Sequence, residues 1–307
     1  MTIHRSWTLD TLVEAFQQHE RRTRGLRDRT LRGYARLVRL FARSAFGDDP
    51  VDPSRLCSAD VIGFVAAMMD RYSPRSMKTV RSALRSFFRF LRVHGLCAQQ
   101  LDLAIPLVAS WRLSALPRGL SERQLKQVLT SFDTSVRCGF RDRAIVMCLS
   151  TLGLRPQELA DLRLEDIDWR DGTMQLRSRK TRRGAALPLP REAGGAIVDY
   201  LRQERPQTHE RRVFVQHSGP RRGEPISGHT LSAAAARVLQ RAGVDAPLQG
   251  AYVFRHTVAS RMVQQGTSLK EVADFLGHRC LDSAMIYAKL DLAALREVAL
   301  PWPEVAP

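Results

Sequence analysis

The sequence predicts a mainly α-helical protein of two domains, with one small β-hairpin in the second domain. Apolar residues recur at steps of three and four through residues 1–115 and again from Arg191 onward, the period of amphipathic helices. Between these parts, a stretch after Asp166 changes to a period of two, which is typical of strands. A chain of 307 residues is long enough for about two domains of ordinary size.

In the first domain, 1–115, two predicted helices each carry an apolar face and a basic face. The helix Thr30–Ala45 places Leu31, Tyr34, Val38 and Phe41 on the apolar side, and the basic stripe is Arg29, Arg32, Arg36, Arg39 and Arg43. The helix Pro74–Val93 places Val80, Leu84, Phe87 and Leu91 on the apolar side, and the basic stripe is Lys78, Arg81, Arg85, Arg89 and Arg92. One such stripe alone favours a solvated helix face. Two all-basic stripes that contain hardly an acidic residue indicate that at least one of them contacts phosphate.

Pro106 and Pro117 bracket a segment of weak periodicity, which predicts the domain boundary and a second domain of 116–307. Ser121 and Gln124 predict the N-cap of its first helix. The further elements follow in order: helix Asp142–Leu152 with an apolar side, ended by Gly153; a helix begun by Pro156; strands Thr173–Arg177 and Ala186–Leu189 around a basic turn; and helices Ala193–Arg202, Leu231–Arg241, Val253–Gln264 and Leu269–Leu276, the last capped by Ser268 and Glu271.

The charge balance indicates a polyanionic partner. Lys and Arg number 48 against 31 Asp and Glu, a net charge of +17. No apolar run is long enough for a membrane span, and the N-terminus is not a signal peptide, so we expect a cytoplasmic protein that binds DNA or RNA. The five cysteines are scattered without CxxC spacing, and the histidines form no HxxxH pair. These patterns argue against structural zinc and disfavour a metal enzyme.

Five short motifs carry groups suited to phosphodiester chemistry: Arg155, with Glu158 one helical turn later and placed to orient its guanidinium; Lys180 in the basic turn; Arg255; His278 after Leu276-Gly277; and Tyr287. A guanidinium presents two parallel donors to phosphate oxygens, a phenol can serve as nucleophile, and an ammonium can donate a proton. Taken singly, such residues are ordinary: Arg155 and Glu158 can form a surface ion pair, Lys180 can simply bind DNA, and Tyr287 can be a packing residue.

Taken in order, these motifs resemble the tyrosine recombinase, or phage integrase, family, and most of all its Xer-type bacterial branch. The resemblance covers essentially the whole chain. It implies a core-binding (SAM-like) helical domain before the tyrosine recombinase catalytic fold, and a site-specific DNA recombinase or integrase. The activity it implies is cleavage and rejoining of DNA through a 3′-phosphotyrosyl intermediate, without metal or cofactor.

The resemblance also implies a role for each residue. Tyr287 would be the nucleophile, Lys180 the acid for the 5′-hydroxyl leaving group, and the groups that stabilise the transition state would be Arg155, Arg255 and His278. Tyr252 stands where the family usually has histidine, and a phenol is a poor base near neutral pH. We interpret His256 as structural. Arg179, Arg182 and Arg183 are expected to bind DNA. In a rival interpretation, Lys180 also only binds DNA and is not the acid.

As partners, the resemblance implies double-stranded DNA and a tetramer in the synaptic complex, with a second recombinase as an open possibility. The apolar tail Leu290–Val298 would either dock on a neighbouring protomer or pack on its own domain. We favour the integrase of a mobile element. The alternatives are a type IB topoisomerase-like DNA-relaxing enzyme and a catalytically impaired DNA-binding homologue; an RNA-binding protein has little support, since no stacking platform is evident.

Overall fold

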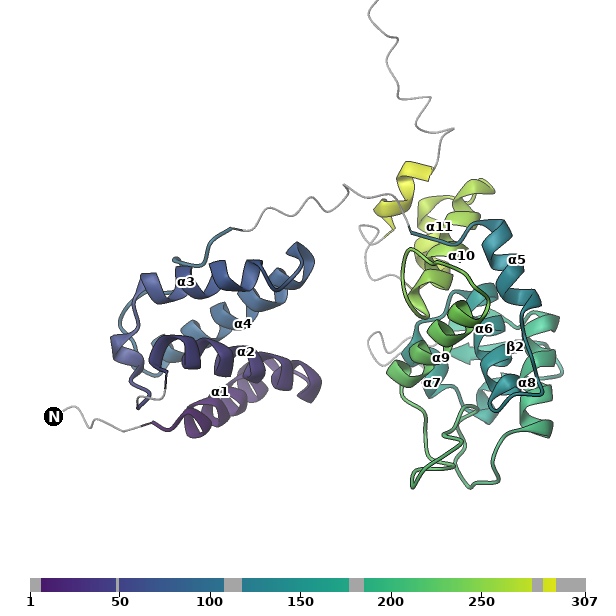
Figure 1. Ribbon diagram of the computed structural model, residues 1–307, viewed down its shortest axis with the longest axis horizontal. Helices are drawn as coiled ribbons and strands as arrows, with labels where there is room; N and C mark the ends of the chain where they lie inside the picture. Colours follow the sequence, from purple (N-terminus) through teal and green to yellow (C-terminus); the bar gives the residue numbers. More distant parts are fainter. Residues whose placement is uncertain (1–6, 48–49, 108–117, 177–184, 278–283, 291–307) are drawn as a thin grey trace, which may run out of the picture. The chain divides into compact units, whose positions relative to one another are not determined.

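The computed structural model describes residues 7–47, 50–107, 118–176, 185–277 and 284–290. The chain forms two compact units, Met1–Arg112 and Leu113–Pro307 (Figure 1). The architecture is mainly helical with one small sheet, as the sequence predicts. Within the described residues, no helix combines the length and the apolar character needed to cross a membrane.

The described residues of unit 1 form four α-helices and one short 3-10 helix: α1 (Leu9–Arg24), α2 (Asp28–Phe46), η1 (Pro53–Arg55), α3 (Ser58–Met69) and α4 (Pro74–Val93). The predicted helix Pro74–Val93 has the bounds of α4, and Thr30–Ala45 lies inside α2. Ser73 caps α4, and Pro74 occupies its first turn, where a missing N–H costs nothing.

The core of unit 1 confirms the two apolar faces. Leu31, Val38 and Phe41 of α2 are buried, as is the whole predicted face of α4. Phe41 and Phe87 are central to a group of aromatic rings packed edge to face, with Phe16 and Phe87 at 5.5 Å between ring centroids. This packing leaves the basic faces of α2 and α4 outside the core.

Unit 2 surrounds a buried helix. Its elements are α5 (Glu122–Thr130), α6 (Gly139–Leu152), α7 (Pro156–Asp161), η2 (Leu164–Asp166), β1 (Ile167–Asp168), β2 (Thr173–Leu176), β3 (Ala185–Pro188), α8 (Arg191–Gln203), α9 (Gly228–Arg241), α10 (Tyr252–Gln264), α11 (Leu269–Phe275) and η4 (Met285–Leu290). Helix α6 contacts α8, α9 and α10 (Figure 1). It is buried on more than the predicted side, since Ala144, Val146 and Ser150 are also inside.

The small sheet has the strand order β1-β2-β3 and is antiparallel throughout. Met174 of β2 pairs with both Ile167 of β1 and Leu187 of β3, and all three side chains are buried. The two predicted strands are confirmed as β2 and β3 with shifts of one residue at their ends. β1 was missed because two residues are too short to show a period. The basic turn between β2 and β3 lies outside the described residues.

Candidate active site and nucleic-acid interface

Arg155 occupies the junction between α6 and α7. Gly153 ends α6 with a left-handed backbone, φ +60°, and Arg155 is the N-cap of α7, which begins at Pro156. The Glu158 carboxylate accepts a hydrogen bond from the Arg155 backbone N–H at 2.9 Å and another from Nη1 at 2.6 Å. Arg155 Nη2 donates to the carbonyl of Gly277 at 2.9 Å. The predicted contact of Glu158 with Arg155 is therefore present, and it both caps α7 and orients the guanidinium.

Arg255 lies in α10, and its side chain is buried. Nη1 donates to the carbonyl of Gly153 at 2.8 Å, and Nη2 donates to the carbonyl of Leu276 at 2.6 Å. Burial, and after it the positive charge of Arg155, lowers the pKa of the Arg255 guanidinium to about 10. The group stays charged at neutral pH, but burial and its cationic neighbour both oppose that charge, and a bound anion would favour it.

The end of α11 holds the two arginines beside each other. The consecutive carbonyls of Leu276 and Gly277 accept from Arg255 and Arg155, respectively. Gly277 has a φ of +60°, and a Cβ at this position would lie 3.7 Å from Arg155 Nη1. Within the described residues, each guanidinium uses two of its five N–H donors in these hydrogen bonds, so donors remain for an oxyanion.

Tyr287 lies in η4, which packs beside α10 and α11 (Figure 1, yellow). Its side chain is 2% exposed, in an apolar cluster that includes Ala259, Val263 and Leu276. The hydroxyl lies 2.8 Å from Nδ1 of His256. Burial raises the pKa of Tyr287 to about 12, although the positive charge of Arg255 acts in the opposite direction. The phenol is therefore protonated at neutral pH, within the field of Arg255.

His256 is the residue that sequence reasoning missed. The sequence indicated only a structural role for it, whereas in the structure its imidazole contacts the Tyr287 hydroxyl. A usable signal was present: His256 follows Tyr252 by four residues, so the two share one face of α10. Tyr252 itself begins α10, is 53% exposed, and is close enough to Arg255 to influence its pKa.

Several predicted site residues lie outside the described residues: Lys180 and His278 of the catalytic set, and Arg179, Arg182 and Arg183 of the basic turn. The apolar tail after Leu290 lies outside them as well. The described part of the chain thus brings together Arg155, Glu158, Arg255 and Tyr287, with Tyr252 at the edge of the group.

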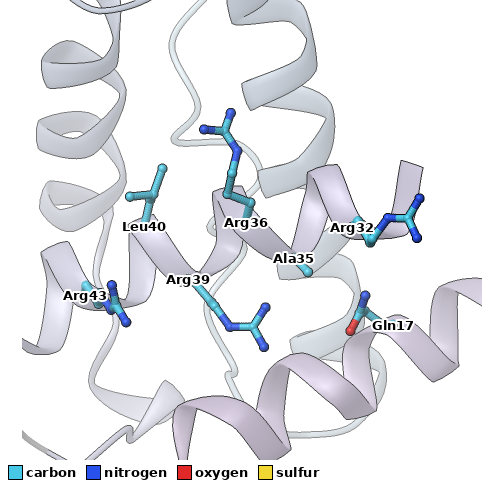
Figure 2. A pocket seen from close by; sticks show the side chains of 7 residues that line it. All are labelled: Gln17, Arg32, Ala35, Arg36, Arg39, Leu40 and Arg43. Carbon is cyan, nitrogen blue, oxygen red and sulfur yellow. The ribbon is translucent and has the colours of Figure 1, made fainter. Parts of the chain in front are cut away.

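The basic stripe of α2 borders a hollow on unit 1. Arg32, Arg36, Arg39 and Arg43 line a cavity of about 400 Å³ together with Gln17 of α1 (Figure 2). Figure 2 shows the side chains of Arg36 and Arg39 leaving the helix in opposite directions. Arg36 donates to the Tyr72 hydroxyl at 3.1 Å, and Arg39 donates to Asp10 at 3.1 Å. The cavity therefore has a wall of guanidinium groups, with Arg29 exposed near the start of the same helix.

On α4 the predicted basic stripe is only partly at the surface. Lys78, Arg85 and Arg89 are exposed, whereas Arg81 is half-buried and its Nε has no hydrogen-bond partner within the described part of the chain. The two stripes thus offer cations at positions that the packing of the apolar faces determines.

One cluster of described residues has the ligand types of a metal site. The ligand atoms of Cys138, Glu204 and His217 lie within 4.8 Å of one another. Burial and the positive charges of Arg141, Arg137 and Arg222 lower the pKa of His217 to about 4. The positive potential that opposes a proton on His217 also opposes a divalent cation, so the surroundings do not favour metal binding.

Two family models match this chain. Residues 118–293 match "Phage integrase family", and residues 13–95 match "Phage integrase, N-terminal SAM-like domain". A relative from Sinorhizobium fredii with the name "Putative integrase/recombinase y4rA" is 40% identical over 300 residues, which span 98% of this chain and 73% of the relative. Tyrosine recombinase XerD of Listeria monocytogenes is 27% identical over 299 residues, which span 94% of this chain and 97% of the relative.

Solved structures share the fold. The XerH site-specific recombinase in a post-cleavage complex with palindromic difH substrate has a TM-score of 0.73 and 19% identity, covering 97% of this chain and 85% of that one. A lambda integrase (75–356) dimer bound to a COC′ core site has a TM-score of 0.69 and 19% identity, covering 98% of this chain and 100% of that one.

Proposed function

The chain belongs to the phage integrase family of tyrosine recombinases, which cleave and rejoin DNA in site-specific recombination, and we propose that Tyr287 is the nucleophile with which it does so. The proposal rests on one observation above all. Arg155, Arg255 and Tyr287 come from distant parts of the sequence, yet Arg255 interacts electrostatically with both Arg155 and Tyr287. The two arginines also donate to consecutive carbonyls, those of Gly277 and Leu276.

The two guanidinium groups form the phosphate-binding part of the proposed site. Arg255 is held by two backbone carbonyls, and Arg155 is held by one backbone carbonyl and by the Glu158 carboxylate, so their donors are oriented before substrate binds. A phosphodiester that gains negative charge in its transition state would be stabilised between them. Tyr252, exposed at the start of α10, is proposed to donate a hydrogen bond to a phosphate oxygen.

In the proposed reaction, the oxygen of Tyr287 forms a bond with the scissile phosphorus while the bond to the 5′-oxygen breaks. Lys180 is proposed to protonate that leaving oxygen, and His278 to donate to the phosphate, as the resemblance implies for both. The 5′-hydroxyl of another strand then attacks the phosphotyrosine and releases Tyr287. The phosphotyrosyl bond retains the energy of the broken linkage, so the cycle needs no nucleotide or metal.

The helical residues 1–115 are proposed to bind duplex DNA, and 116–307 to carry catalysis. The family model of the SAM-like domain and the basic stripes of α2 and α4 support the first assignment. We also propose that the protein forms a tetramer in a synaptic complex, that it serves a mobile element, and that it acts in the cytoplasm on nucleoid DNA. A lambda integrase tetramer on a Holliday junction and a Tn1549 transposon integrase bound to transposon end DNA, both solved, support the first two by analogy.

Covalent capture tests the proposal. A pool of nicked duplexes with randomised sequence around the nick is incubated with wild-type protein and with the Tyr287→Phe variant. Adducts that survive denaturant are isolated and mapped by peptide mass. We expect wild type to retain DNA through Tyr287 and the variant to retain none, because a phenylalanine offers no nucleophile.

The same pool also separates the alternatives. An adduct that persists in Tyr287→Phe, or maps to another residue, contradicts the proposed nucleophile. Tight DNA binding without any adduct in wild type supports the catalytically impaired homologue instead. Sequencing of the captured DNA gives the target site, which the later experiments use.

A further inference from the structure

Burial creates a chemical problem at Tyr287. With a pKa of about 12, only about one phenol in 10⁵ is ionised at pH 7. Arg255 helps the anionic form but cannot remove a proton, since its guanidinium is already protonated. An efficient attack on phosphorus therefore needs a neighbouring group that takes the proton as the new bond forms.

The His256 imidazole is the group that meets this need in the described part of the chain. Nδ1 lies 2.8 Å from the Tyr287 hydroxyl, the distance of a strong hydrogen bond. The ring centroids are 5.7 Å apart with an interplanar angle of 53°, so the contact is made by the edge of the imidazole and not by stacking. With its proton on Nε2, the neutral ring presents Nδ1 as an acceptor.

The surrounding charges suit a transient imidazolium only while substrate is present. On its own helix, His256 adjoins Arg255 and follows Tyr252 by one turn, and it faces Tyr287 of η4. Arg155, the N-cap of α7, and Glu158 within α7 are charged groups that act on Arg255. In the free protein, this set is dominated by cations. A bound phosphodiester adds negative charge beside the two arginines, and this negative charge favours a further positive charge on the imidazole.

We propose that His256 is the general base that receives the Tyr287 proton during DNA cleavage and returns it during rejoining. The proposal rests on Tyr287 being the nucleophile. In cleavage, the O–H bond of Tyr287 breaks as N–H forms at Nδ1, the phenol oxygen bonds to phosphorus, and the 5′-oxygen leaves with a proton from a separate acid. In rejoining, the attacking 5′-hydroxyl returns its proton to the conjugate base of that acid as its oxygen bonds to phosphorus. The phosphotyrosyl bond breaks, and Nδ1–H protonates the departing phenol oxygen.

Two substitutions separate proton transfer from simple positioning. His256→Ala removes the acceptor. His256→Asn keeps an acceptor oxygen near the place of Nδ1, yet an amide does not take a proton. Single-turnover cleavage of the captured nicked duplex is measured for both, together with DNA affinity and thermal unfolding. We expect both variants to cleave about 10² to 10⁴ times more slowly than wild type, the usual contribution of general acid–base catalysis.

A more acidic nucleophile supplies the decisive readout. Incorporation of a ring-fluorinated tyrosine at position 287 lowers the pKa of the phenol, so less help is needed to ionise it and it leaves more readily in rejoining. The cleavage deficit of His256→Ala should then shrink at least tenfold, while the deficit of Arg155→Ala, whose side chain binds phosphate, should not shrink. His229→Ala, at an exposed histidine of α9, is the matched control.

Wild-type cleavage by His256→Asn overturns the proposal in favour of a positioning role. A deficit in His256→Ala that the fluorinated tyrosine leaves unchanged also overturns it, since a structural defect does not depend on phenol acidity. Failure of the proposed function is seen separately, as an adduct that survives in Tyr287→Phe. If His256→Ala unfolds, His256→Asn with and without fluorinated tyrosine gives the same discrimination.

Discussion

Arg155 and Arg255 donate to adjacent carbonyls of one turn, those of Gly277 and Leu276. Two groups of like charge are thereby held together, and the charge of Arg155 helps to lower the pKa of Arg255. Like charges at close range repel, so the arrangement costs free energy in the free protein and is relieved by an anion. This preference for an anion is what the proposed role of the two arginines in binding a phosphodiester requires.

The double donation of Arg255 gives the first prediction. Arg255→Lys keeps a positive charge, but a single ammonium cannot reproduce the planar fork that reaches Gly153, Leu276 and a phosphate together. We expect single-turnover cleavage to fall about 10²- to 10³-fold, as for loss of a transition-state donor, with DNA affinity nearly unchanged. Arg261→Lys, an exposed position in the last turn of α10, is the control and should cleave normally. A similar loss in both variants would contradict a specific role for Arg255.

Glu158 and Glu271 make a matched pair. Each is the third residue of a helix and completes a capping box, but Glu158 also accepts from the Arg155 guanidinium. Substitution of either by Gln keeps an acceptor for the capping box but removes a negative charge from the helix N-terminus. Both should therefore lower the free energy of unfolding by a similar amount, about 0.3 to 1 kcal/mol. Only Glu158→Gln should slow DNA cleavage, by about tenfold, because the charge that orients Arg155 is lost. Calorimetry and single-turnover cleavage test this, and equal cleavage rates in the two variants would refute it.

The stripe on α2 predicts a salt effect. If Arg32 and Arg43 contact phosphates, each substitution by Ala should reduce the slope of log affinity against log salt by about one. Arg55→Ala removes the same charge from η1, away from the stripe, and should leave the slope as in wild type. Fluorescence anisotropy with labelled duplex over a range of salt concentrations measures the slopes. An equal change in all three variants would indicate a general charge effect and no specific contact.

His217 predicts a loss of stability in acid. Its pKa is about 4 in the folded chain, lowered first by burial and then by Arg141, against an unfolded value of 6.5. The unfolded chain therefore binds the proton more readily, so the stabilising contribution is complete above pH 6.5 and is lost as the pH falls towards 4. His217→Phe keeps a ring to stack on Tyr200 and cannot titrate. Between pH 6.5 and 4, we expect the free energy of unfolding of the variant to fall by about 1 kcal/mol less than that of wild type, after allowance for the partial exposure of His217.

Denaturant unfolding at several pH values measures that difference. His229→Phe, at an exposed histidine of α9, is the control and should follow wild type. A decline in His217→Phe as steep as in wild type would show that another group titrates.

Local features of this protein were determined by the sequence alone. Apolar periodicity predicted α4 with its bounds, and Ser268 with Glu271 predicted the cap of α11, because these interactions join residues at most four apart. The spacing of Glu158 after Arg155 likewise predicted their contact. The order of the motifs also sufficed to indicate the family, which the comparisons established.

The tertiary structure alone decided how the site is assembled. Arg155 meets the carbonyl of Gly277 across 122 positions of sequence, and Tyr287 meets His256 across 31. Neither contact follows from a helical period, which tells only which face of a helix is apolar. Their partners depend on how α10, α11 and η4 pack against one another, and that packing buries Tyr287, raises its pKa and places the imidazole of His256 at its hydroxyl.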